Sequence, residues 1–521
     1  MLAIRPWALG AAVLIAALPG GASAQNASAA DTFVVLRGSD TLAVERFSRS
    51  AGRLEGTLAE HVSGGQVAYT ATIAADESVP HLGLQVHPPG QPESTVRSVT
   101  IDLRGDTAVV ETPAGPQRLA TRAGAFPYIN LSFALLEQAV RRARKLGSGP
   151  VELPFFIGGQ TVPATVRTVA GDTVSVVLGG ADLRAVVDAA GRVVAASVPA
   201  QGVVVHRSGS SAAPPAAAKP DYSPPAGAPY AAEEVSVPGP GGTLAGTLTL
   251  PRARRGRIPA VVTITGSGPQ DRDEALPSVG DYRPMRQVAD TLSRRGIAVL
   301  RLDDRGTGAS TGSFGTATSE DFAADIEAAV RWLRARPEID PARIALLGHS
   351  EGGLIAPLVA ARDPRVRAIV LMAGPAQTGR QIIEFQQRYA AEHDTALTPA
   401  RRDSALAAAH VVLDSLATHN AWMRFFLAYD PLSTARKVRA PVLIVQGATD
   451  QQVTAAQAET LGAAFRAGGD RDVTVRVFPG HNHLFLADPS GDPRGYAGLP
   501  SHRIDPGVLG TVANWLAAKL K

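Results

Sequence analysis

The hydrophobic pattern divides the chain into two parts of different character. Residues 31–207 carry short β-prone runs broken by turn residues, whereas residues 230–521 alternate continuous apolar runs with longer amphipathic segments. The first pattern is typical of antiparallel hairpins. The second is typical of a parallel sheet covered by helices on both faces. We therefore expect a smaller β-rich antiparallel domain followed by an α/β domain.

The β-rich domain, which we place at residues 25–207, is expected to contain one helix over residues 131–146, with Leu135 and Leu146 on its buried side. Histidines are scattered through this domain, and we expect no catalytic group in it. The expected strands lie at residues 33–36, 41–47, 67–73, 98–103, 107–112, 161–169, 173–178, 192–198 and 202–206.

A change of composition separates the two domains. Residues 208–229 are rich in Pro and Ala, which is typical of a stiff linker. The α/β domain then occupies residues 230–521. After an opening hairpin, its expected strands lie at residues 260–265, 297–302, 344–347, 368–372, 442–446 and 473–478, and its expected helices at residues 282–294, 319–334, 354–361 and 455–466.

One connection in the α/β domain is much longer than the others. Residues 378–437 contain three helical stretches, at 381–392, 399–418 and 421–428. Connections within compact α/β units usually take only a few residues, so a long helical excursion favours a cap or lid. The full expectation is a mostly parallel sheet with helices on both faces and a helical cap.

Composition narrows the classes of function. The 521 residues allow two or three domains. A net charge of +4 arises from 51 basic and 47 acidic residues spread along the chain, so nothing indicates nucleic-acid binding. There is no cysteine, which excludes disulfides and thiolate metal sites. Nothing in the pattern specifies an oligomeric state.

The first 24 residues have the form of a secretory signal peptide. Arg5 precedes an apolar stretch at residues 7–18, and Ala22-Ser23-Ala24 fits a cleavage site. The apolar stretch is too short for a confident membrane span. With no cysteine near the cleavage site, a lipoprotein anchor is excluded. We expect an exported protein, periplasmic or secreted, with no stable membrane anchor.

The strongest chemical signal is a serine between an apolar strand and a helix. Gly348, Ser350 and Gly352 fit the G-x-S-x-G nucleophile elbow, whose small neighbours allow a sharp turn that exposes the serine hydroxyl. A chance match is possible in a chain with 52 glycines. The strand before the serine and the helix after it make chance a poor explanation, so Ser350 is the expected nucleophile.

An acid and a base follow in the order that such a serine needs. Asp450 comes directly after the apolar strand at 442–446, and His481 and His483 come after the next strand. Asp303 and Asp304 precede the serine and are expected to be structural. No carboxylate cluster accompanies the histidines at metal-ligand spacing, so no metal is expected.

A tetrahedral oxyanion needs two backbone N–H donors. The N–H of Glu351, the residue after the nucleophile, supplies the first. The loop that follows the strand at 260–265 supplies the second, from Ser267 or alternatively Gly266, and Gly266 and Gly268 allow the backbone to approach the substrate. No cofactor is expected, because an oxyanion hole replaces a metal in this chemistry.

Four motifs together resemble the α/β-hydrolase superfamily over residues 230–521. More narrowly, they are similar to bacterial carboxylesterases grouped with serine aminopeptidase-like hydrolases and with acyl-CoA thioesterase or bile-acid acyltransferase-like domains. The motifs are Gly266-Ser267-Gly268-Pro269-Gln270-Asp271-Arg272-Asp273-Glu274, Asp303-Asp304-Arg305-Gly306-Thr307-Gly308, Gly348-His349-Ser350-Glu351-Gly352-Gly353 and Gly480-His481-Asn482-His483-Leu484-Phe485.

The resemblance implies an acyl-serine mechanism. It implies that His483, which directly precedes Leu484-Phe485, is the base rather than His481, and that Asp450 orients it. It also implies that Asp304 and Arg305 stabilise the site loops and that Asp271 and Arg272 position the oxyanion loop. Residues 25–207 lie outside it.

The favoured function is hydrolysis of a small carboxylic ester with a short acyl chain. One alternative is a serine exopeptidase, which would need a charged anchor in the cap such as Glu384, Arg388 or Glu392. Another is an acyl thioesterase. A binding protein with a vestigial hydrolase domain is the least favoured, since no member of the triad is missing. Aromatic residues in the cap are expected mostly to pack the lid.

Overall fold

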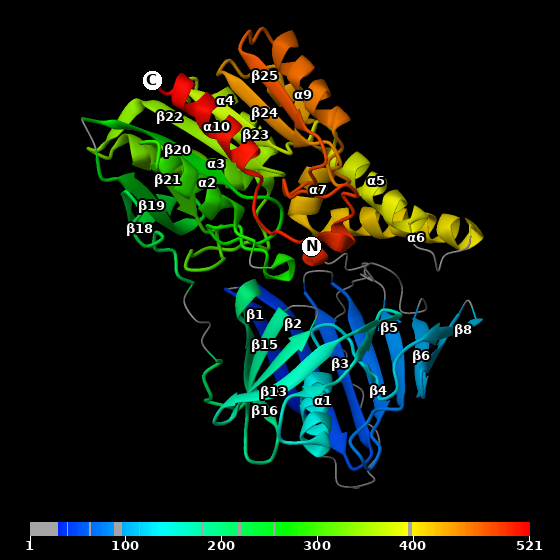
Figure 1. Ribbon diagram of the computed structural model, residues 1–521. Coiled ribbons are helices and arrows are strands. Elements are labelled where there is room, and N and C mark those ends of the chain that lie inside the picture. Colours follow the sequence, from blue (N-terminus) through cyan, green and yellow to red (C-terminus); the bar gives the residue numbers. More distant parts are fainter. Residues whose placement is uncertain are drawn as a thin grey trace, which may run out of the picture. The chain divides into compact units, whose positions relative to one another are not determined.

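The computed structural model describes residues 30–521 except 39, 62–63, 88–95, 114, 179–180, 216–219, 254–255, 281 and 394–398 (Figure 1). The expected signal peptide lies outside the described residues. The chain divides into two compact units, one made mainly of residues before 220 and the other mainly of residues from Pro220 onward.

The N-terminal unit is built on one long antiparallel sheet of 14 strands. The strand order is β10-β13-β14-β15-β16-β17-β1-β2-β3-β4-β5-β6-β7-β8, and each neighbouring pair is antiparallel. The bounds are β1 Asp31–Arg37, β2 Asp40–Ser50, β3 Arg53–Glu60, β4 Gln66–Thr72, β5 His81–His87, β6 Arg97–Arg104, β7 Thr107–Thr112, β8 Gly115–Ala120, β10 Val151–Glu152, β13 Ala164–Ala170, β14 Thr173–Leu178, β15 Ala181–Val187, β16 Val193–Val198 and β17 Val203–Arg207.

Five strands of this sheet, β3, β5, β8, β10 and β15, fall outside the strands expected from the sequence. The expected strand at 161–169 is divided by Pro163, which cannot donate to a ladder. Its first part pairs in a separate three-stranded sheet, formed by β9 Phe126–Pro127, β11 Phe155–Ile157 and β12 Gln160–Val162. A short 3-10 helix, η2 Pro199–Gln201, precedes β17.

Helix α1, Phe133–Leu146, packs into the core of this unit. Its N-terminus is held by Glu45 of β2, whose carboxylate accepts from the N–H groups of Phe133 at 2.7 Å and Ala134 at 2.9 Å. Free N–H groups at a helix start favour a negative charge. Leu146, which we expected to be buried, is 50% exposed because it lies in the last turn, where the helix leaves the core.

The C-terminal unit contains an eight-stranded sheet in the order β18-β19-β21-β20-β22-β23-β24-β25. The first two strands pair antiparallel, and the strands from β21 to β25 in this order are parallel. The bounds are β18 Tyr230–Gly239, β19 Gly242–Pro251, β20 Ile258–Ile264, β21 Ala298–Leu302, β22 Ile339–His349, β23 Ala368–Met372, β24 Val442–Gly447 and β25 Val473–Phe478.

Helices cover both faces of this sheet (Figure 1). One face packs against α3 Ser319–Arg334, α4 Gly352–Arg362 and α9 Ala456–Ala467, and the other against α2 Pro284–Ser293 and α10 Pro506–Lys519. In β22, Ile344 and Leu346 belong to the first core and Ala345 and Leu347 to the second. Alternate residues of a strand point to opposite faces, so a strand buried on both faces must be continuously apolar. The expected fold class is confirmed.

The long connection between β23 and β24 is helical. It contains α5 Gly379–Glu392, α6 Pro399–His419, α7 Ala421–Ala428 and α8 Pro431–Ala435. Helices α5 and α7 pack closely, since a Cβ on Gly379 would lie 2.3 Å from Phe426 Cδ1. The remaining 3-10 helices are η3 Pro277–Val279 and η4 Pro493–Gly498.

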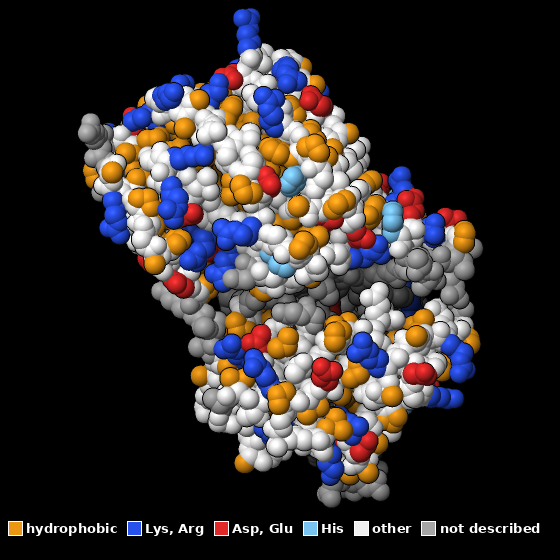
Figure 2. Space-filling model, viewed as in Figure 1, with side chains coloured by type: hydrophobic (Ala, Val, Ile, Leu, Met, Phe, Trp, Pro, Cys, Tyr) orange, Lys and Arg blue, Asp and Glu red, His pale blue; other side chains and the backbone are white. Residues whose placement is uncertain are grey.

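Basic and acidic side chains are interspersed on the face drawn in Figure 2 rather than gathered by sign. Among the helices of the described residues, none is long and apolar enough to cross a membrane.

Candidate active site

Ser350 stands in a strained turn between β22 and α4. Its φ is +52°, in the left-handed region that a side chain rarely adopts, and its N–H donates to Met372 O at 2.9 Å. The flanking glycines are required by close contact. A Cβ on Gly348 would lie 2.0 Å from Gly352 O, and a Cβ on Gly352 would lie 2.3 Å from Ile264 O. The hydroxyl is thus presented at the start of α4, where helix N–H groups favour negative charge.

Asp450 and His483 are hydrogen-bonded at the ends of neighbouring strands. His483 Nδ1 lies 2.7 Å from Asp450 Oδ2, and both side chains are buried. Asp450 Oδ1 accepts from the N–H groups of Gln452 at 2.7 Å and Val453 at 2.9 Å. Oδ2 also accepts from Gln446 Nε2 at 2.8 Å. These four donors fix the carboxylate, which in turn fixes the imidazole with its Nε2 free for proton transfer.

His481 is held elsewhere. Its Nδ1 lies 2.7 Å from Pro479 O, and its Nε2 lies 3.5 Å from Asp505 Oδ2. The structure therefore pairs Asp450 with His483 and not with its neighbour. His483 is also brought to the end of β22, because His349, the residue before Ser350, donates from Nε2 to His483 O at 3.1 Å.

The oxyanion loop follows β20. Within the described chain, neither the N–H of Ser267 nor that of Glu351 donates to a protein atom, whereas the N–H of Gly266 donates to Glu274 Oε1 at 3.1 Å. Gly268 has a φ of +95°. The turn therefore leaves Ser267 and Glu351 as the available donors and engages Gly266, the alternative second donor.

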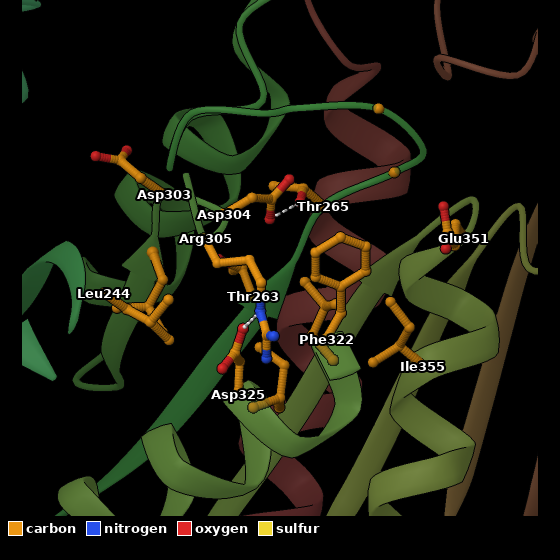
Figure 3. A pocket seen from close by; sticks show the side chains of 15 residues that line it. Leu244, Thr263, Thr265, Asp303, Asp304, Arg305, Phe322, Asp325, Glu351 and Ile355 are labelled. Atoms are coloured by element: carbon orange, nitrogen blue, oxygen red, sulfur yellow. Dashed lines mark hydrogen bonds and ion pairs between the residues drawn. The ribbon is translucent and has the colours of Figure 1, made fainter. Parts of the chain in front are cut away.

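Asp304 anchors this loop. It accepts from Gln270 N at 2.9 Å and from Thr265 Oγ1 at 3.1 Å. Burial and the nearby charges of Glu351 and Asp303 raise the pKa of Asp304 well above its usual value. A cavity of about 30 Å³ lies beside these residues, lined in part by Thr265, Asp304 and Glu351 (Figure 3). That volume has room for ordered water.

Buried ion pairs hold the remaining motif residues. Arg272 donates to Asp303 from Nε at 3.0 Å and from Nη2 at 2.9 Å. Arg305 donates from Nε to Asp325 Oδ2 at 2.7 Å. Asp271 accepts from Ala275 N at 2.9 Å. These contacts connect the loops to one another and to α3.

Two residues of the site, Glu274 and His349, had no role in the sequence analysis. Glu274 Oε1 lies 2.6 Å from His349 Nδ1 and also accepts from Gly266 N, so this carboxylate joins the oxyanion loop to the elbow. Burial lowers the pKa of His349, but the charge and hydrogen bond of Glu274 outweigh it and leave the pKa raised. Both residues lie inside the quoted motifs. Their pairing across 75 positions has no local signature.

No group of three His, Cys, Asp or Glu side chains that could hold a metal occurs among the residues that the structure describes. Within the cap, Oε1 of Glu384, one of the candidate anchors for an exopeptidase, lies 3.4 Å from His410 Nδ1 and 3.7 Å from Arg380 Nη1.

Comparison with known proteins agrees with this geometry. The model of the family described as serine aminopeptidase S33 matches residues 280–490, which include Ser350, Asp450 and His483. The C-terminal unit is thus similar to this family of hydrolases. The chain is 27% identical over 306 residues to the esterase EstD of Thermotoga maritima, covering 57% of this chain and 69% of that protein.

It is also 29% identical over 258 residues to an uncharacterised protein of Mycobacterium tuberculosis, covering 50% of this chain and 75% of that one. Among solved structures, an esterase of Pyrococcus furiosus aligns with 17% identity and a TM-score of 0.40, covering 56% of this chain and 92% of that chain. The family match and the similarity to EstD support a hydrolase that resembles esterases.

Proposed function

We propose that this hydrolase cleaves small carboxylic esters, with a preference for short acyl chains, through an acyl-serine intermediate. The observation that carries the proposal is the buried 2.7 Å hydrogen bond between Asp450 and His483, next to a serine at a strained elbow. An acid that orients a base beside an exposed hydroxyl is the arrangement that activates a serine.

In the proposed reaction, Ser350 Oγ attacks the ester carbonyl carbon while His483 Nε2 takes the hydroxyl proton. The oxyanion accepts from the N–H groups of Ser267 and Glu351. Collapse breaks the bond to the alkoxy oxygen, which receives the proton from His483 and leaves as the alcohol. Water, deprotonated by His483, then attacks the acyl-serine and releases the acid. Asp450 stays ionised throughout and stabilises the imidazolium.

The location of the reaction is part of the proposal. A signal-peptide-like leader at residues 1–24 supports an exported enzyme that acts in the periplasm or outside the cell. The expected ligand is a small ester rather than nucleic acid, since the charges are mixed in sign along the chain.

The test is hydrolysis of p-nitrophenyl esters of increasing acyl length by the purified protein and by Ser350→Ala. We expect the variant to lose about 10³-fold or more in kcat, as removal of a triad nucleophile does. An aminoacyl p-nitroanilide and an acyl thioester serve as parallel substrates. Cleavage of the anilide alone would favour the exopeptidase, cleavage of the thioester alone the thioesterase, and full activity in the variant would reject Ser350.

A further inference from the structure

The carboxylate of Glu351 makes contacts that the proposed reaction does not require. Glu351 follows the nucleophile, and catalysis uses only its backbone N–H. Its side chain is nonetheless buried, with 3% exposure. Burying a carboxylate costs free energy unless it is hydrogen-bonded, so this side chain needs donors around it. Figure 3 shows it at the start of α4, separated by Phe322 from the ion pair of Arg305 and Asp325. No arginine in that view neutralises it.

Its partners come from three separate parts of the α/β-hydrolase unit. Oε1 accepts from Ser319 Oγ at 2.5 Å, at the start of α3, and from Trp422 Nε1 at 2.7 Å, in the cap helix α7. Burial raises the pKa of Glu351, and hydrogen bonding, first from Ser319 and then from Trp422 and Ser267, opposes that effect. The carboxylate thus bonds to the start of α3 and to the cap, while the backbone N–H of the same residue is one of the two proposed oxyanion donors.

Trp422 is itself fixed within the cap. Its ring stacks on Phe426, with centroids 4.8 Å apart and planes at 10°. Phe426 in turn lies against Gly379 at the start of α5. The indole N–H therefore has a position set by the packing of α5 against α7, and any movement of these helices changes the Trp422–Glu351 hydrogen bond.

We propose that Glu351 is a positioning residue that couples the cap to the oxyanion hole, an inference that rests on the proposed function. Trp422 holds the Glu351 carboxylate when the cap is in place, and this bond fixes the position of Glu351, whose backbone N–H is one of the two oxyanion donors. A displacement of about 1 Å at such a site can cost about 100-fold in rate. The cap thereby acts on the chemical step as well as on substrate binding.

The main experiment compares Trp422→Phe with Trp515→Phe. The first change removes the indole N–H and keeps an aromatic ring to stack on Phe426. The second is a matched control, because Trp515 Nε1 is buried with no hydrogen-bond partner in the described structure. We expect Trp422→Phe to lower kcat about 10-fold, the effect of losing a hydrogen bond to a charged group, with KM nearly unchanged. Trp515→Phe should leave both constants unchanged.

Variants of Glu351 supply the second readout. Glu351→Ala should lower kcat more than Glu351→Gln, since the amide oxygen keeps one acceptor, and active-site titration of Ser350 corrects for any misfolded fraction. The effects of Trp422→Phe and Glu351→Ala should not add in the double variant, because each change alone removes the same hydrogen bond. Additive effects, or a Trp422→Phe variant with normal kcat, would overturn the coupling.

The outcomes for the two proposals are separable. If Ser350→Ala abolishes ester cleavage while Trp422→Phe has no effect, only the coupling fails. If the wild-type protein cleaves none of the esters, the proposed function fails. A double-mutant cycle of Trp422 and Glu351 is then measured from the free energies of unfolding in denaturant. Additive changes in free energy would show that the two side chains do not interact.

Discussion

At the scale of single residues, the hydrogen bonds of Asp450 show why the candidate site requires a particular side chain. All four of its partners, the N–H groups of Gln452 and Val453, Gln446 Nε2 and His483 Nδ1, are donors. An acceptor-only carboxylate matches this environment, whereas an amide places its NH₂ against a donor. The site is therefore specific for Asp over Asn, although the two side chains have the same shape.

We predict that Asp450→Asn lowers kcat by about 10³- to 10⁴-fold, because His483 loses the acceptor that fixes its tautomer and orientation. The measurement is steady-state hydrolysis of the best p-nitrophenyl ester. The matched control is His481→Gln, which alters the neighbouring histidine that Asp450 does not bind and should change kcat less than about threefold, as surface changes away from a site usually do. Reversed effects would make His481 the base.

At this scale, the sequence was informative where chemistry has a local signature. Ser350 was recognisable from two flanking glycines, and the structure explains both by close backbone contacts. Glu274 and Trp422 have no such signature. Glu274 meets His349 across 75 positions and Trp422 meets Glu351 across 71, so only the folded chain reveals them.

At the scale of elements, the C-terminal α/β unit was more predictable than the β-rich unit. β23 has the expected bounds, because a strand buried on both faces is a continuous apolar run. β3 and β15 carry charged residues at Arg53, Glu55 and Arg184, since one face of each is open to solvent. A strand with one solvent-facing side has polar residues at every second position. In the sequence it resembles a loop unless the alternation of apolar and polar residues is followed along the whole strand.

The attachment of α1 to β2 gives a prediction at this scale. We expect Glu45→Ala to lower the free energy of unfolding of the N-terminal unit by about 2–3 kcal/mol, because the N–H groups of Phe133 and Ala134 and the hydroxyl of Ser132 lose their buried acceptor. Denaturant unfolding followed by circular dichroism measures the change.

Glu55→Ala is the control for this change. Glu55 is an exposed glutamate on β3, paired with the exposed Arg53 at 2.8 Å, and such surface pairs contribute about 0–1 kcal/mol. Equal losses in the two variants would show that the helix start does not depend on its carboxylate.

At the scale of the whole molecule, hydrophobic burial is divided between separate cores. Leu58 of β3 belongs to the core of the N-terminal unit, and Leu346 of β22 to a core of the C-terminal unit, and both are fully buried. The change of pattern near residues 208–229 predicts a domain boundary in this part of the chain. The domain limits themselves stay predictions.

We predict two unfolding transitions in calorimetry. Leu58→Ala should destabilise one and Leu346→Ala the other, each by about 2–5 kcal/mol, the usual cost of a buried cavity. Ester hydrolysis measured along the same temperature scale should disappear with the transition that Leu346→Ala moves. A single transition moved by both variants would mean that the two units unfold together.

The crowding at the elbow has a practical use in identifying the natural substrate. Gly348 and Gly352 leave no room for any side chain, but position 350 already carries a Cβ, so Ser350→Ala changes no backbone contact. Under the proposed mechanism, we expect this variant to keep the shape of its binding site and to lose the ability to cleave what it binds. Immobilised as bait and exposed to extracts of the natural surroundings, it would retain intact esters for mass spectrometry, which the active enzyme would destroy.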